Sequence, residues 1–155
     1  MKKLDFFGAG PKIGRIALPW LAATIILTLV FSAVFTFGLA AKPSLFIAGS
    51  IILAAGLILY AVTVRSLLKG LKETRLVTTG LYRVCQNPLY AVIMLLIIPG
   101  IALMMNSWII LTTPVAGYMV FRRYISQEYK EMTEVFGEDY IKYHERTPEF
   151  FPFLR

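Results

Sequence analysis

The sequence predicts an all-α integral membrane protein with four transmembrane helices, the last two a tight hairpin, followed by a cytoplasmic amphipathic helical tail. Three observations support this fold class. Hydrophobic residues make up 57% of the 155 residues and charged residues only 16%, against about 45–50% and about 25% in soluble domains. Long stretches of the chain carry no charged residue at all. The Lys and Arg residues also collect on one side of the predicted membrane.

Three stretches without Asp, Glu, Lys or Arg define the spans. The stretch between Arg15 and Lys42 has 26 residues and that between Lys42 and Arg65 has 22. Each fits one helix, because crossing a bilayer takes about 20 apolar residues. The stretch between Arg83 and Arg122 has 38 residues and therefore predicts two helices joined by a tight turn. The predicted spans are residues 16–40, 44–65, 88–104 and 107–123.

The basic residues predict the orientation of these spans. With four spans, both termini lie on the same side of the membrane, and 15 of the 16 Lys and Arg residues fall on that side. Only Lys42 lies on the other side. Positively charged segments are retained in the cytoplasm, so both termini are expected to be cytoplasmic. The first apolar run is too long for a signal peptide and is interpreted as a retained span.

Composition also excludes several classes of site. Cys85 is the only cysteine and His144 the only histidine, which excludes an intramolecular disulfide and paired-His zinc motifs, and no metal site is predicted. Cys85 is interpreted as an inert filler and His144 as a surface residue. The net charge of +7 is assigned to the cytoplasmic membrane face, so the expected partners are membrane lipids rather than nucleic acid. No obligate protein partner is evident.

Two segments rich in polar and aromatic residues flank the last two predicted spans on the cytoplasmic side. The first, residues 76–90, reads LVTTGLYRVCQNPLY. Within it, Asn87 followed by Pro88 predicts the start of a helix, with Asn as the N-cap and Pro at the first helical position. The free backbone amides at a helix start favour an anion. On its own, this segment is also typical of an ordinary helix start.

The second segment is the tail, residues 126–155. Phe136, Tyr140 and Tyr143 have the spacing that places them on one face of a helix. Gly137 is expected to break or cap that helix. By composition alone, the tail is equally typical of an amphipathic helix that lies on the membrane with Phe anchors. Together, the two segments predict a site for a charged cofactor beside lipid.

The first segment resembles the signature of the isoprenylcysteine carboxyl methyltransferase and phospholipid methyltransferase superfamily. These integral membrane enzymes use S-adenosylmethionine. The residues that match the family pattern are Leu76, Thr78, Gly80, Tyr82, Arg83, Pro88 and Tyr90. Asn87 stands where the carboxyl methyltransferases have His and is similar to other members, whereas Gln86 replaces the usual Arg.

The tail resembles the second signature of the same superfamily. The residues that match it in order and spacing are Glu128, Phe136, Gly137, Glu138, Tyr140, Tyr143 and Pro148, with Asp139 a close substitute. Tyr129, Thr147 and Glu149 stand where the family has Glu, Val and Arg. The resemblance covers residues 66–154, and two signatures in order around an apolar stretch are far more specific than one.

The resemblance implies transfer of a methyl group from S-adenosylmethionine to a lipophilic acceptor at the cytoplasmic membrane face. The acceptor would be a prenylcysteine carboxylate, a phospholipid amine or a similar small lipid. Within a single membrane domain, residues 1–155, it implies that residues 1–65 form the first two spans and residues 66–155 the cofactor-binding catalytic core. The implied cofactor-binding residues are Tyr82, Asn87, Pro88, Tyr90, Tyr140 and Tyr143.

Glu128 and Arg146 are the candidate catalytic residues. Glu128 is placed to accept a proton from an amine acceptor or to orient it. Arg146 is placed to hold a carboxylate acceptor, because the guanidinium forms a planar fork of donors. A role as a solvated surface charge is the alternative for each residue, and it is the stronger alternative for Arg146.

Two other classes of protein remain as alternatives. Membrane reductases of sterol or steroid type resemble the tail and bind a nicotinamide cofactor, NADPH, in a similar place. They usually show Asn-Tyr-x-Gly-Glu after the proline of the motif, where this chain has LYAVI at residues 89–93. A non-enzymatic membrane scaffold or small transporter is the other alternative. Against transport, no charged residue lies deep in the predicted spans to relay an ion or proton.

Overall fold

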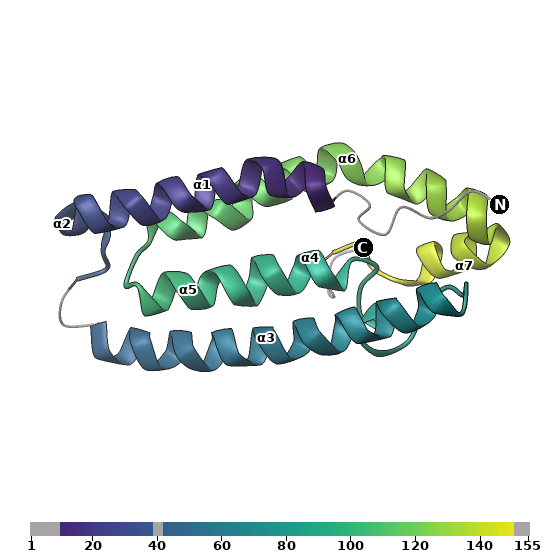
Figure 1. Cartoon of the computed structure of the whole chain (residues 1–155), viewed down its shortest axis with the longest axis horizontal. Coiled ribbons are helices and arrows are strands. Elements are labelled where there is room, and N and C mark those ends of the chain that lie inside the picture. The colour runs from purple at the N-terminus through teal and green to yellow at the C-terminus, as the bar shows by residue number, and fades with distance from the viewer. Residues whose placement is uncertain (1–9, 39–41, 151–155) are drawn as a thin grey trace.

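The computed structural model describes residues 10–38 and 42–150, and these residues form an all-α bundle (Figure 1). The predicted all-α class is therefore confirmed. In chain order, the elements are α1 (Gly10–Val30), α2 (Ser32–Phe35), α3 (Lys42–Lys72), the 3₁₀ helix η1 (Gly80–Arg83), α4 (Pro88–Val92), the π-helix η2 (Ile93–Ile97), α5 (Ile98–Met104), the 3₁₀ helix η3 (Ile109–Leu111), α6 (Thr112–Phe136) and α7 (Glu138–Arg146).

Two of these helices, α1 and α3, are long and apolar enough to cross a membrane by length and composition. They correspond to the first two predicted spans. α4, η2 and α5 form one shorter apolar helix from Pro88 to Met104, which has the bounds of the third predicted span. The fourth predicted span, residues 107–123, falls on η3 and the first half of α6. The number of four spans stays a prediction.

Two helices run past the ends of their predicted spans. α3 continues from Arg65 to Lys72, and α6 continues from residue 123 to Phe136. The last charge-free residue of each stretch therefore does not mark the end of the helix. Leu, Lys, Glu and Met are good helix formers, so both helices continue through the charged residues that follow.

The helices pair in a pattern that Figure 1 makes visible. α1 lies along α6, and α3 lies along α4, η2 and α5. Residues 105–111, which include η3, connect α5 to α6. α5 has its largest interface with α3, and α6 has its largest interface with α1, so the predicted tight hairpin of the last two spans is not confirmed.

Glycines bring α3 and α5 into close contact. A Cβ atom on Gly49 would lie 2.6 Å from the backbone nitrogen of Met104 and 2.7 Å from the carbonyl oxygen of Gly100. A Cβ atom on Gly100 would lie 2.8 Å from the backbone nitrogen of Leu53. No real Cβ fits at such distances from backbone atoms. Small residues permit this approach between apolar helices, and here they fix the position of α5 on α3.

Hydrogen bonds join separate segments of the chain at the end of the bundle where α2 lies. Thr28 Oγ1 and Ser107 Oγ are 2.7 Å apart, and both residues are buried. Trp108 Nε1 donates to the carbonyl of Val34 at 3.1 Å. These bonds join α1 and α2 to the segment between α5 and α6, so this end of the bundle is held without charged residues.

Gly137 separates α6 from α7, as the sequence predicts. Its φ of 57° lies in the left-handed region that favours glycine. α7 then ends at Arg146, directly before Thr147 and Pro148. The tail is therefore a separate helix that turns back across the end of the bundle. Of the Phe residues expected as membrane anchors, Phe150 is instead buried in the bundle against Phe121. Phe151 and Phe153, together with Lys2, Lys3 and both chain termini, lie outside the described residues.

Candidate functional site

A cavity of about 750 Å³ runs between the helices, within the range of about 300–1,000 Å³ typical of small-molecule sites. Side chains of α1, α3, α4, α6 and α7 line it. One end is polar, because it collects Glu128, Glu131, Arg75 and a group of tyrosines. The other end is apolar, with Leu21 and Ile101 among its lining residues.

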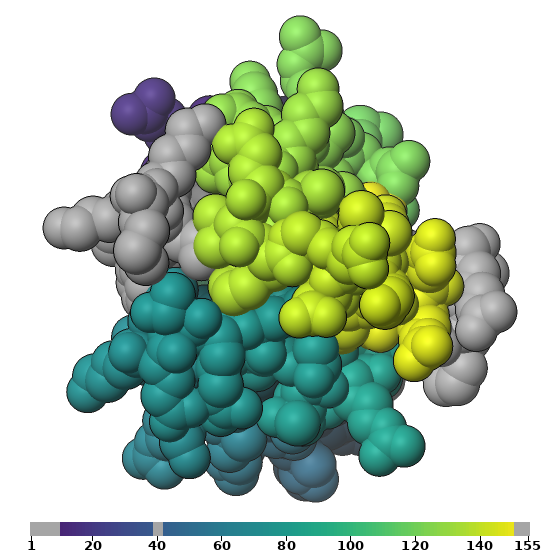
Figure 2. Space-filling model, turned by 90° about the vertical axis from the view of Figure 1, so that its right-hand side faces the viewer, coloured from purple at the N-terminus to yellow at the C-terminus, as the bar shows by residue number. Residues whose placement is uncertain are grey.

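The polar end of the cavity lies where α6, α7 and the end of α3 meet. Figure 2 views the molecule from this end, and the second half of α6 and α7 lie directly against the end of α3 and the segment after it. Residues far apart in the sequence thus come together there. The tail forms part of this end of the bundle and is not a separate arm.

Seven of the eight predicted site residues line this one cavity. They are Tyr82, Asn87, Pro88, Tyr90, Glu128, Tyr140 and Tyr143. Tyr82, Asn87 and Tyr140 are buried, at 9%, 7% and 4% exposure. The eighth residue, Arg146, is exposed at the end of α7 and is not among the lining residues. The structure therefore brings together the predicted cofactor residues and Glu128, and it leaves Arg146 outside the group.

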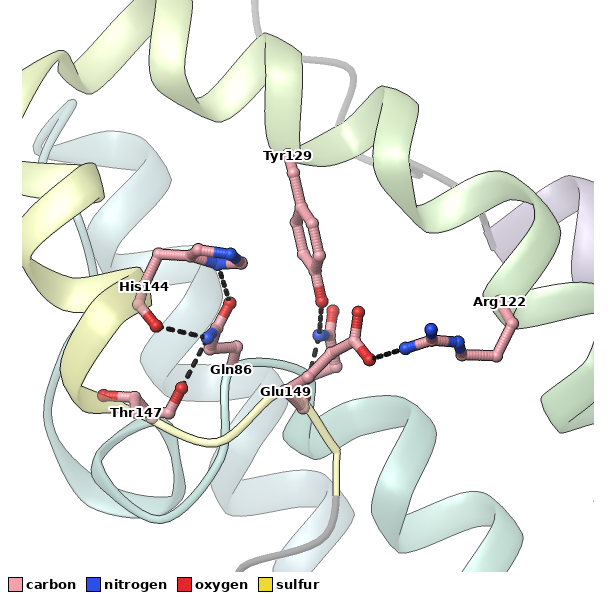
Figure 3. Close-up of polar contacts among 7 residues, drawn as sticks. Gln86, Arg122, Tyr129, His144, Thr147 and Glu149 are labelled. Atoms are coloured by element: carbon pink, nitrogen blue, oxygen red, sulfur yellow. Dashed lines mark hydrogen bonds and ion pairs between the residues drawn. The ribbon is translucent and has the colours of Figure 1, made fainter. Parts of the chain in front are cut away.

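Hydrogen bonds attach the tail to residues 82–87. Tyr143 donates its hydroxyl to the carbonyl of Tyr82 at 2.6 Å. The backbone N–H of Gln86 donates to the carbonyl of Pro148 at 2.8 Å. The Gln86 side-chain NH₂ donates to the carbonyls of His144 and Thr147, and its Oε1 lies 2.6 Å from His144 Nδ1 (Figure 3). The end of α7 is thus held to the segment that precedes α4.

Asn87 holds the tail and α6 at the same time. Its side-chain NH₂ donates to the Tyr129 hydroxyl at 2.8 Å and to the carbonyl of Glu149 at 2.9 Å. The Glu149 carboxylate forms an ion pair with Arg122 of α6 (Figure 3). Asn87 does precede Pro88 at the start of α4, as predicted, but its side chain makes no cap hydrogen bond. It joins three segments instead of capping one helix.

Burial sets the protonation of the tyrosines around the polar end. It is the largest cause that raises the pKa of Tyr82, Tyr140 and Tyr143, and the Glu128 charge raises the pKa of Tyr82 and Tyr140 further. Tyr90 OH lies 3.5 Å from Glu128 Oε2. These phenols therefore keep their protons at neutral pH. They present hydroxyl donors and neutral aromatic faces around the Glu128 carboxylate.

The two residues expected to be inactive lie beside the site. Cys85 is buried, and burial raises its pKa to about 11, which keeps it a neutral thiol and agrees with an inert filler. His144 is exposed, as expected of a surface residue. Its ring nevertheless bonds to Gln86 and packs edge-on against Tyr129, with centroids 4.9 Å apart. His144 is therefore part of the contact that holds the tail.

Sequence reasoning missed the network of Gln86, Tyr129, Thr147 and Glu149. These are the positions at which the chain departs from the superfamily signatures. In the structure all four are joined through Gln86 and Asn87. The sequence did contain a signal for this network. When residues differ from the superfamily pattern in both signatures at once, they are candidates for contact with each other. Arg75 and Glu131, two charged lining residues that were also missed, carry no such signal.

The described residues form an all-α protein with a cavity of small-molecule size between apolar helices. The sequence model of the phospholipid methyltransferase family matches residues 43–139, which is more than half of the chain. The chain therefore belongs to the phospholipid methyltransferase family. The matched region runs from α3 to the start of α7 and includes the first signature and Glu128. Membership indicates methyl transfer to lipid-like substrates and location in a membrane. No curated protein and no solved structure matches the chain.

Proposed function

We propose that the chain transfers a methyl group from S-adenosylmethionine to a lipophilic acceptor at the cytoplasmic face of a membrane. One observation carries this proposal. A single cavity has a polar end lined by Glu128 and tyrosines and continues into an apolar arm between the helices. A charged cofactor and a lipid need such contrasting surroundings, and methyl transfer requires their reacting atoms to lie side by side.

The residues at the polar end fit a sulfonium cofactor. Aromatic faces attract cations, and Tyr82, Tyr140 and Tyr143 supply such faces beside the carboxylate of Glu128. Arg75, the one Lys or Arg among the described lining residues, is ion-paired with Glu73 through Nε, and its two terminal nitrogens would offer donors to a second carboxylate. When bound, S-adenosylmethionine would supply an electrophilic methyl group. The tyrosines and Arg75 would bind and orient it, and the surrounding apolar helices would exclude water.

Glu128 is the residue proposed to handle the acceptor. An amine acceptor loses a proton when its nitrogen gains a methyl group, and Glu128 would take that proton or orient the amine. A carboxylate acceptor releases no proton and needs a cation instead. Arg146 was predicted for that role from the sequence, and its exposed position makes Glu128 the stronger candidate. The geometry therefore favours an amine over a carboxylate.

The apolar arm is proposed to hold the hydrocarbon part of the acceptor. Its lining includes Ala17 and Leu18 of α1, Val64 of α3 and Ile98 of α5. Leu18 is 67% exposed on the outside of the bundle. The arm therefore reaches the surface that would face lipid, and an acceptor could enter from the bilayer without crossing water.

We further propose four spans with both termini in the cytoplasm. Cysteine labelling of intact cells or sealed vesicles, with Cys85 replaced first, tests this topology. The loop between α5 and α6 should be labelled only from the outer side. Asn106 in that loop is buried, so Trp108 in the same loop, which is 42% exposed, is the better position for Trp108→Cys. Labelling from the cytoplasm would contradict four spans.

The direct test of function is a search for methylated lipids. The purified protein is incubated with a lipid extract and S-adenosylmethionine that carries a deuterated methyl group, and mass spectrometry identifies lipids that gain the label. The proposal expects labelled lipids with wild-type protein and none with Glu128→Gln at matched times. A protein that instead consumes NADPH, and transfers no label, would be a reductase.

A further inference from the structure

Gly117 of α6 lies at a narrow point of the cavity where three helices meet. A Cβ atom on Gly117 would lie 3.0 Å from Met94 Cε on η2 and 4.0 Å from Ala17 Cβ on α1. All three residues line the cavity. Met94 Cε therefore already fills the space beside Gly117, and a side chain at position 117 would have to displace the end of the Met94 side chain. The width of the cavity at this point depends on both residues.

This narrow point lies partway along the apolar arm. Gly117 precedes Glu128 by 11 residues on α6, which is about 16 Å along the helix. The lining continues beyond it to Thr113 on α6, about 6 Å further, and from Met94 to Ile101 on the facing helix, about 10 Å. About 6–10 Å of the arm therefore lies beyond the narrow point, on the side away from Glu128.

We infer that Gly117 and Met94 determine the length of the hydrocarbon chain that the acceptor can carry. This inference rests on the proposed function and deepens it, because it makes the substrate class a long-chain lipid. Carbon–carbon bonds of about 1.5 Å give an extended chain about 1.25 Å per carbon, so the stretch beyond the narrow point holds about five to eight carbons. Met94 is flexible and can adjust to the passing chain.

Binding of lipids with graded chain lengths tests the inference. The probes are lysophosphatidylethanolamines with saturated chains of 8 to 18 carbons and, separately, N-acetylcysteines that carry 10-, 15- or 20-carbon isoprenoid chains. Dissociation constants are measured by competition against a fluorescent lipid in detergent. With wild-type protein, each added carbon should improve affinity about fourfold until the arm is full. If affinity rises with chain length only in the lysophosphatidylethanolamines, the acceptor carries an acyl chain. If it rises only in the N-acetylcysteines, the acceptor carries an isoprenoid chain.

Gly117→Leu should shorten the arm without disturbing its polar end. The gain with chain length should stop five to eight carbons earlier, so the longest chains should lose roughly 1,000-fold or more in affinity. The shortest chains should bind as they do to wild type. Adding Met94→Ala to Gly117→Leu should restore most of the long-chain affinity. Gly117→Ala, which needs only a small shift of Met94, should move the limit less and remains usable if the Leu variant does not fold.

Val115→Leu is the matched control, because Val115 lies on the same helix with 55% exposure and does not line the cavity. Its chain-length profile should equal that of wild type. Equal losses at every chain length, or an unchanged profile in both Gly117 variants, would overturn the inference. Methyl transfer by the wild-type protein is measured in parallel. A chain-length profile that shifts in the Gly117 variants, without methyl transfer by the wild type, would contradict the proposed function alone. Methyl transfer with an unshifted profile would contradict this inference alone.

Discussion

The two halves of the bundle differ in how closely their helices approach. Along α3, the close glycine contacts with α5 and its neighbours run from Gly49 to Gly56, and the cavity lining begins one turn later at Tyr60. In the first half, α5 packs directly on α3, and the cavity reaches this half only through residues of other helices and of α5, such as Leu21, Ile101 and Thr113. In the second half, α3 also lines the cavity, and the tail covers it through hydrogen bonds to residues 82–87. Close packing of α5 on α3 thus fixes the helices that line the cavity further along. Mutations in the packed half should therefore change mainly the free energy of unfolding, and mutations in the half with the site should change mainly turnover.

The largest effect is expected in the half with the site. Glu128→Gln keeps the size of the side chain and removes its charge, so turnover should fall by roughly 10²–10⁴-fold. S-adenosylhomocysteine affinity and the melting temperature should change little, because Glu128 acts on the acceptor. Steady-state kinetics with the identified lipid measure the loss.

Arg146→Lys provides the comparison for that variant. Lys keeps the charge and loses the planar fork, so a strong loss at Arg146 with a mild loss at Glu128 would indicate a carboxylate acceptor. Wild-type turnover in both variants would mean that both residues are surface charges, and that the reacting centre lies elsewhere.

The next largest effect is expected on stability, in the half of the bundle where α5 packs on α3. Gly100→Ala places a Cβ 2.8 Å from the backbone nitrogen of Leu53, so the helices must separate, and the free energy of unfolding should fall by about 1–3 kcal/mol. Thermal unfolding in detergent measures the change. Gly14→Ala is the matched control, because its Cβ meets only the end of Leu18 at 3.8 Å. Equal melting temperatures in both variants would contradict close packing of α3 on α5.

A smaller effect is expected where the tail attaches. Tyr143→Phe removes the hydroxyl that donates to the carbonyl of Tyr82, and one such bond contributes about 0.5–1.5 kcal/mol. S-adenosylhomocysteine affinity should therefore fall roughly 2- to 12-fold. Tyr118→Phe is the control on α6, because Tyr118 does not line the cavity. If Tyr143→Phe and Tyr118→Phe changed S-adenosylhomocysteine affinity equally, the hydrogen bond from Tyr143 to Tyr82 would have no specific role in cofactor binding.

The smallest effect is expected at Cys85. Because burial raises its pKa to about 11, the thiol stays protonated at lower pH and becomes a thiolate only as the pH rises through that value. The pH–rate profiles of wild type and Cys85→Ala should therefore superimpose from pH 7 to 10, with rates within twofold. Profiles that diverge in this range would show that Cys85 takes part in the reaction.

The sequence was a good guide to what periodicity and motifs encode. The all-α class, the end of α6 at Gly137 and the grouping of Asn87 with Tyr140 follow from apolar stretches, a helix-breaking glycine and two signatures. The place of Arg146 outside the cavity and the contact of His144 with Gln86 did not follow. That contact joins residues about 60 positions apart in the chain, and both features depend on how α7 turns back. The pairing of α5 with α3 was missed for a similar reason, since it depends on the fit of Gly49 against Gly100 and not on adjacency in the chain.

The central claim is that the first signature and the tail build one cofactor site. Isothermal titration of the full chain and of a chain truncated after Phe136 tests it most directly, with S-adenosylhomocysteine as ligand and NADPH as comparison. The full chain should bind S-adenosylhomocysteine and not NADPH. The truncated chain should lose this binding while its helices remain inserted in the membrane, as protease protection would verify. Unchanged affinity for S-adenosylhomocysteine in the truncated chain would contradict a site shared by the two segments.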